Sequence, residues 1–104
     1  MAFHENGHIA TTVRLMEWLK TDLVAGVSKL HQSLFSGAEK KAVEALNQIM
    51  VTCYLLGKKL GLTYYRLDCS LQQRVKQLLR QEEEEELLRE ELLELLQYLE
   101  SREK

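Results

Sequence analysis

The sequence contains no proline and only five glycines, and residues 62–104 contain neither. β-rich and loop-rich proteins need these residues in their turns, so this composition argues against both classes. There are two cysteines, Cys53 and Cys69, and they form no CxxC pair. They are too few for a disulfide framework and do not indicate a cysteine-type zinc site.

The sequence also lacks a long hydrophobic run. Its longest mainly apolar stretch, residues 49–56, is far shorter than the ~18 residues that a membrane helix requires. Residues 1–8 show no basic segment followed by an apolar one, as a signal peptide would. We therefore expect a reduced, soluble, cytoplasmic protein without a membrane partner.

The chain has 104 residues and a net charge of −2, but its charges are unevenly distributed. Residues 1–80 carry eleven Lys/Arg and six Asp/Glu, whereas residues 81–104 carry three and ten. The basic residues are scattered and are not interleaved with aromatic residues, so no nucleic-acid partner is expected. The acidic segment is typical of a solvated helix face.

Apolar residues at steps of three and four predict helices throughout the chain. The first helix is expected over residues 9–35, after a flexible tail of residues 1–8, and Ser36-Gly37 ends it. The second is expected over residues 38–60, with Lys58 and Lys59 in its last turn and Gly61 directly after its end.

The second helix is apolar over most of its circumference. One stripe comprises Ala42, Leu46, Ile49, Cys53, Leu56 and Leu60. Cys53 is interpreted as a small core residue on this stripe. A helix that is apolar nearly all round must be buried on several sides, which a chain of this size is too small to achieve alone. The pattern therefore predicts a homo-oligomer, a dimer or tetramer, formed through residues 38–60.

A third helix is predicted after Thr63, which is a suitable N-cap residue. Five glutamates follow Gln81, and then leucines recur to Leu99 in a fourth helical segment. Whether these two helices join is left open, as is whether the last one packs on its own chain or on a partner. The predicted fold is an all-α antiparallel bundle, with a helical domain over residues 9–80 and an acidic helix over residues 81–104.

The segment from His4 to His8 matches the H-E-x-x-H pattern of zinc hydrolases, with Glu5 inside it. Asn6-Gly7 favours a turn within the motif, and no third ligand is apparent, although His31 or a glutamate could serve. We interpret the match as chance spacing in the tail, with a small zinc protease as the alternative.

Glu44 and Asn47 lie three residues apart near the start of the second helix, so their side chains share one face. Their oxygens could bind Mg²⁺, which prefers carboxylates and other oxygen ligands. Such a site needs further acids from a neighbouring helix.

Three segments resemble the MazG-like family of all-α nucleotide pyrophosphohydrolases, and in particular its short bacterial members. They are residues 43–49, 54–62 and 67–76, with residues 17–23 similar to the N-terminal portion. The resemblance implies a helical fold that hydrolyses nucleoside triphosphates to monophosphate and pyrophosphate. It also implies Mg²⁺ ligands in an E-x-x-E motif on one helix and an E-x-x-D motif on the next.

Carried over to this sequence, the second motif becomes Glu44-x-x-Asn47, and the first falls at Asp22-x-x-Ala25. The resemblance thus implies Asp22, Glu44 and Asn47 as metal ligands, with fewer acids than the family pattern. Two hypotheses follow. The protein is an oligomeric binding or regulatory module with lost or weakened hydrolysis, or it is a divergent Mg²⁺-dependent pyrophosphohydrolase with a nucleotide as its ligand.

Overall fold

The computed structural model describes residues 2–81 and 85–102, with side chains from residue 9 onward. Four helices account for most of this part of the chain, and it contains no strand. They are α1 (Ala2–Ser36), α2 (Glu39–Lys59), α3 (Tyr64–Leu79) and α4 (Glu86–Ser101). The all-α prediction is confirmed. None of the described helices is both long and apolar enough to cross a membrane.

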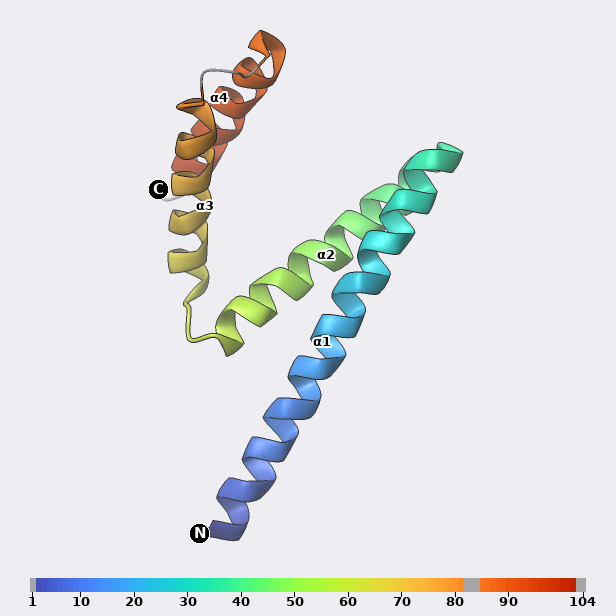
Figure 1. The fold of residues 1–104 in the computed structure, drawn as a ribbon, viewed down its shortest axis with the longest axis vertical. Helices are drawn as coiled ribbons and strands as arrows, with labels where there is room; N and C mark the ends of the chain where they lie inside the picture. The colour runs from blue at the N-terminus through green and yellow to red at the C-terminus, as the bar shows by residue number, and fades with distance from the viewer. Residues whose placement is uncertain (1, 82–84, 103–104) are drawn as a thin grey trace. The chain divides into compact units, whose positions relative to one another are not determined.

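The chain divides into two compact units, Met1–Gly61 and Leu62–Lys104, and each contains one antiparallel helix pair (Figure 1). The boundary between the units lies at Gly61 and does not coincide with the expected segment boundary after residue 80. Gly61 has a positive φ of 94°, which favours glycine after a helix end.

The turn between α1 and α2 forms where Ser36-Gly37 predicted it. Gly37 has a φ of 73°, in the left-handed region, and the Ala38 N–H donates to the Ser33 carbonyl oxygen at 2.9 Å. This hydrogen bond satisfies one of the carbonyls that the end of a helix leaves without an intrahelical partner.

α1 begins at Ala2, so the expectation that the helix starts at Ile9 after a flexible tail is wrong for the backbone. Extending an existing helix by one residue requires no new nucleus, so a weak local preference such as that of Asn6-Gly7 need not end it.

α3 and α4 are separate helices, which answers the question that the sequence leaves open. The predicted N-cap of α3 is confirmed, because the Arg66 N–H donates to Thr63 Oγ1 at 3.1 Å. Val75 packs in a core with Leu92 and Leu99, so α4 folds back on α3 within its own chain.

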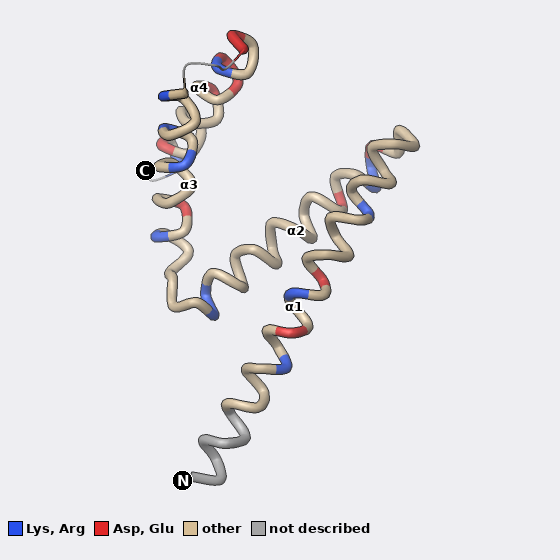
Figure 2. Tube along the Cα trace, in the orientation of Figure 1, with Lys and Arg blue, Asp and Glu red and all other residues tan. Residues whose placement is uncertain are grey.

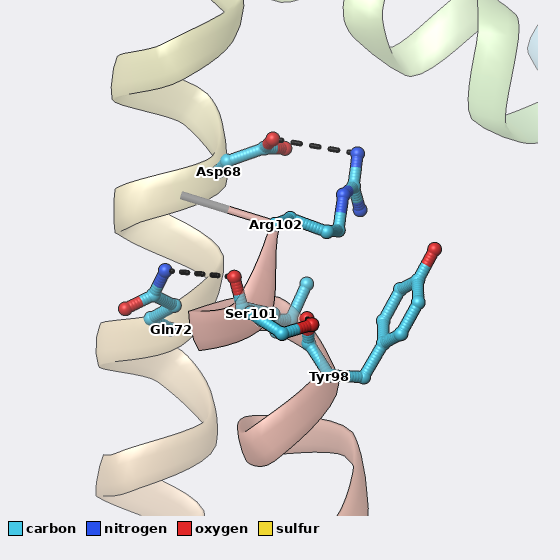
Figure 3. Close-up of polar contacts among 6 residues, drawn as sticks. Asp68, Gln72, Tyr98, Ser101 and Arg102 are labelled. Carbon is cyan, nitrogen blue, oxygen red and sulfur yellow. Dashed lines mark hydrogen bonds and ion pairs between the residues drawn. The ribbon is translucent and has the colours of Figure 1, made fainter. Parts of the chain in front are cut away.

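Polar contacts link the N-terminal half of α3 to the C-terminal end of α4 (Figure 3). The buried Gln72 donates through Nε2 to the Leu99 carbonyl oxygen at 3.3 Å, near the C-terminus of α4. Arg102 Nη2 lies 3.4 Å from Asp68 Oδ2, and its guanidinium is 5.6 Å from the centroid of the Tyr98 ring.

Candidate functional site

α1 and α2 approach each other closely through small residues. A Cβ atom at Gly26 would lie 3.0 Å from Ile49 Cγ1, so only glycine fits there without movement of its neighbour. Ala42 and Ala45 are buried on α2, and Leu19 is fully buried on α1. This packing fixes the rotation of the two helices and therefore which side chains lie on either side of the contact.

The three residues predicted as ligands, Asp22, Glu44 and Asn47, line one pocket on one side of this contact. The pocket has a volume of about 350 Å³. Its lining is completed by Trp18, Gln48, Val51, Thr52 and Leu55. The site therefore has an apolar part and a polar part, and the polar part includes two carboxylates and two amides.

The Asp22 carboxylate is engaged by donors from α2. Gln48 Nε2 donates to Asp22 Oδ1 at 3.2 Å and to the Asp22 carbonyl oxygen at 3.1 Å. Thr52 Oγ1 lies 2.9 Å from Asp22 Oδ2 and 2.7 Å from the Gln48 carbonyl oxygen, so its single proton is shared between these acceptors. Asp22 therefore joins the two helices through neutral donors.

The donor set of this pocket does not fit a magnesium centre of the kind that the resemblance implies. Only Asp22 and Glu44 contribute carboxylates to the lining, and Asp22 already accepts two hydrogen bonds. Among the described residues, no three His, Cys, Asp or Glu side chains are grouped so that they could hold a metal ion. An amide such as that of Asn47 supplies oxygen without charge, which compensates poorly for the dehydration of Mg²⁺.

A second pocket, of about 380 Å³, adjoins the first and shares Glu44 and Gln48 with it. It is lined further by Lys29, Gln32, Ser33, Lys41 and Ala45. Lys29 Nζ donates to Gln48 Oε1 at 3.5 Å, so the Gln48 amide contacts Lys29 on one side and Asp22 on the other. Basic and acidic residues are interspersed along α1 and α2 (Figure 2).

Sequence reasoning missed Trp18, Gln48 and Thr52 as site residues. A usable signal was present, because Glu44, Gln48 and Thr52 recur at steps of four and so form a polar stripe along an otherwise apolar helix. Of these three residues only Glu44 carries a charge, so a search for acidic metal ligands does not detect the stripe.

The other side of the α1–α2 pair carries exposed apolar side chains, and none of them lines either pocket. We call this surface the apolar face, and it comprises Val27, Leu34, Val43, Leu46, Met50 and Leu60. Cys53 lies at the same helical positions and is exposed, so its interpretation as a core residue is wrong. Only part of the predicted stripe faces outward. Leu46, Cys53 and Leu60 are exposed, whereas Ala42 is buried and Ile49 lies against Gly26 of α1.

The side chains of His4, Glu5 and His8 lie outside the described residues, and the zinc hypothesis stays a prediction. His31 is exposed on α1.

Comparison with known proteins agrees with the helical architecture. The model of the MazG-like family matches residues 9–92, which is most of the chain. No curated protein and no solved structure gave a match. Because this match covers most of the chain and the described residues form four helices, the chain belongs to the MazG-like family.

Proposed function

We propose that this protein is a MazG-like module that binds a ligand in the α1–α2 site, has lost or weakened nucleotide pyrophosphohydrolase activity, and works as a homo-oligomer. The observation that carries the loss of hydrolysis is the state of Asp22. Its carboxylate is held by Gln48 and Thr52, so among the described residues Glu44 is the one lining carboxylate that accepts no hydrogen bond from the helices.

The charge of the pocket lining limits metal-assisted hydrolysis. Hydrolysis of a triphosphate with the aid of Mg²⁺ requires several anionic ligands to offset the dehydration of the ions. The pocket offers the carboxylate of Glu44, the carboxylate of Asp22, which already accepts two hydrogen bonds, and the neutral amide of Asn47. These groups favour binding through hydrogen bonds over metal-assisted displacement.

The test measures pyrophosphate release from a panel of standard and modified nucleoside triphosphates, with Mg²⁺ or Mn²⁺. Glu44→Gln is the matched control, because it removes the one carboxylate available to a metal while keeping the shape of the side chain. We expect wild-type and E44Q proteins to release pyrophosphate at the same background rate.

The second candidate is a divergent pyrophosphohydrolase, and the convergence of Asp22, Glu44 and Asn47 on one pocket favours it. In that case Asp22 and Glu44 would bind Mg²⁺, and Asn47 would assist. Metal-dependent release of pyrophosphate that E44Q abolishes would establish this candidate and overturn the first.

The proposal of a homo-oligomer is supported by the apolar face. Leu46 is 45% exposed and Met50 is 52% exposed on α2, and Val27 and Leu34 of α1 are exposed as well. Several exposed apolar side chains on one side of a small helix pair are typical of an interaction site, and a second copy supplies a matching apolar surface.

Neighbouring residues of α2 provide a controlled test of the oligomer. Met50 is on the apolar face, whereas Val51, which is 58% exposed, lines the first pocket. A charge at position 50 would be buried in the interface, so Met50→Glu should convert the oligomer to monomer in sedimentation equilibrium, and Val51→Glu should not. A wild-type monomer at micromolar concentration would refute the oligomer.

A further inference from the structure

The second pocket differs from the first in the sign of its charge. Lys29 and Lys41 line it together with one carboxylate, that of Glu44, and its other lining residues are neutral. Neither lysine forms an ion pair with a carboxylate in the part of the chain that the structure describes. With two lysines and one glutamate, the pocket lining carries one net positive charge.

The two lysines come from different helices and line one pocket because of the α1–α2 packing. Lys29 lies on α1 seven residues after Asp22, and so on the same helix face, whereas Lys41 is in the first turn of α2. Lys29 uses one proton on Gln48 Oε1, which leaves two ammonium protons, and Lys41 has three. The pocket can thus offer several charge-assisted hydrogen bonds to one anion.

The start of α2 adds to the positive potential. No side chain caps this terminus: Ala38 occupies the N-cap position and forms no side-chain hydrogen bond. The N–H groups of a first turn carry a partial positive charge and favour an anion near them. Glu39 and Glu44 oppose this effect in part, and Glu44 is the only one of the two that lines the pocket.

We propose that the second pocket, between Lys29 and Lys41, is a binding site for a phosphoryl group that needs no metal ion. The ligand class is a small phosphorylated molecule whose charge the two lysines neutralise. The inference rests on the proposed function in one respect, namely that lysines instead of Mg²⁺ compensate the charge of the bound phosphate. A phosphate ester could extend from here into the adjoining pocket, whose lining includes Trp18 and Val51.

The experiment is isothermal titration of the full chain in EDTA at low, constant ionic strength, with inorganic pyrophosphate and AMP as separate probes. We expect saturable binding of at least one probe. Tighter binding of AMP would identify an organic phosphate ester as the preferred form, and tighter binding of pyrophosphate would identify an inorganic phosphate. Acetate at the same ionic strength is the control for unspecific anion binding and should not bind.

Variants locate the site. Lys29→Gln and Lys41→Gln should each weaken binding by about tenfold to a hundredfold, the usual effect of losing one charge-assisted hydrogen bond. Lys40→Gln is the matched control, since Lys40 is exposed in the same first turn of α2, has the same charge, and does not line the pocket. Equal losses in K40Q and K41Q would show general charge attraction and overturn the proposal.

Glu44→Gln distinguishes this site from a metal site. It removes the negative charge that lines the pocket, so it should strengthen binding in EDTA by about threefold, on the scale of one partly screened charge pair. Loss of binding in E44Q, or binding that appears only when Mg²⁺ is added, would overturn the proposal. Neither result depends on nucleotide turnover, so this proposal and the proposed loss of hydrolysis fail separately.

Discussion

Asp22→Ala tests whether this carboxylate joins two helices or belongs to a metal site. The substitution removes the acceptor of the Gln48 amide and of the Thr52 hydroxyl. Hydrogen bonds to charged groups contribute about 1.5–3 kcal/mol each. Both donors keep a backbone acceptor, because Gln48 Nε2 also reaches the Asp22 carbonyl oxygen and Thr52 Oγ1 the Gln48 carbonyl oxygen. The loss should therefore be that of about one such bond.

Alanine recovers part of this loss, since it is favoured over aspartate in a helix interior by roughly 0.5–0.7 kcal/mol. The net destabilisation should be about 1–2 kcal/mol, measured by urea unfolding at a fixed protein concentration. Asp22→Asn should lose less. Its amide can donate to Thr52 Oγ1 while its oxygen accepts from Gln48 Nε2.

A metal site makes the opposite prediction. Acids gathered to hold a cation repel each other without it, so removing one of them relieves repulsion with Glu44 and raises stability. An increase in the free energy of unfolding of D22A, measured in EDTA, would refute the helix-joining role that we assign to Asp22.

Three further predictions concern other parts of the chain. Asn47→Asp adds a third carboxylate to the first pocket, so Mn²⁺ at 100 times Kd should stabilise the variant by about 2.7 kcal/mol, measured as a rise in melting temperature, and should not stabilise wild type; an equal response of both proteins would contradict it. Gly37→Ala should cost about 1–2 kcal/mol in urea unfolding through its positive φ alone, since its Cβ meets nothing within 4 Å, and Gly37→Asn should cost less. Gln72→Leu leaves the Leu99 carbonyl oxygen without its donor and should cost about 1 kcal/mol in the same assay, whereas the exposed Gln73→Leu should change little.

The ends of the helices could be predicted where a short local signal determines them. Gly37 and Gly61 both adopt positive φ, and the Thr63 hydroxyl caps α3, as their residue types suggest. These features depend on one to three residues, so the sequence alone contains the information. The separation of α3 from α4 depends instead on the packing of Val75 against Leu92, which is a contact between distant residues.

The burial of α2 could not be predicted from hydrophobicity. The predicted stripe places Leu46 and Cys53 in the core, but both are exposed. The chain buries Ala42 of that stripe together with Ala45 and Thr52, which lie outside it. Close approach of two helices requires small side chains, and Gly26 on α1 provides the complementary space. The helix rotation thus follows from fit between two surfaces, which a one-dimensional pattern does not contain.

The same rotation explains why the acid pattern can change without loss of the fold. Asn47 lies exposed in the pocket lining, and within the described part of the chain no hydrogen bond or core contact links it to α1. An exchange of aspartate for asparagine there alters the charge of the site and leaves the helix contact intact. Asp22 differs, because its carboxylate holds Gln48 and Thr52 and its loss weakens the pair of helices. The carboxylate at position 22 therefore stabilises the helix pair without any metal ion. The side chain at position 47 has no such role in the fold.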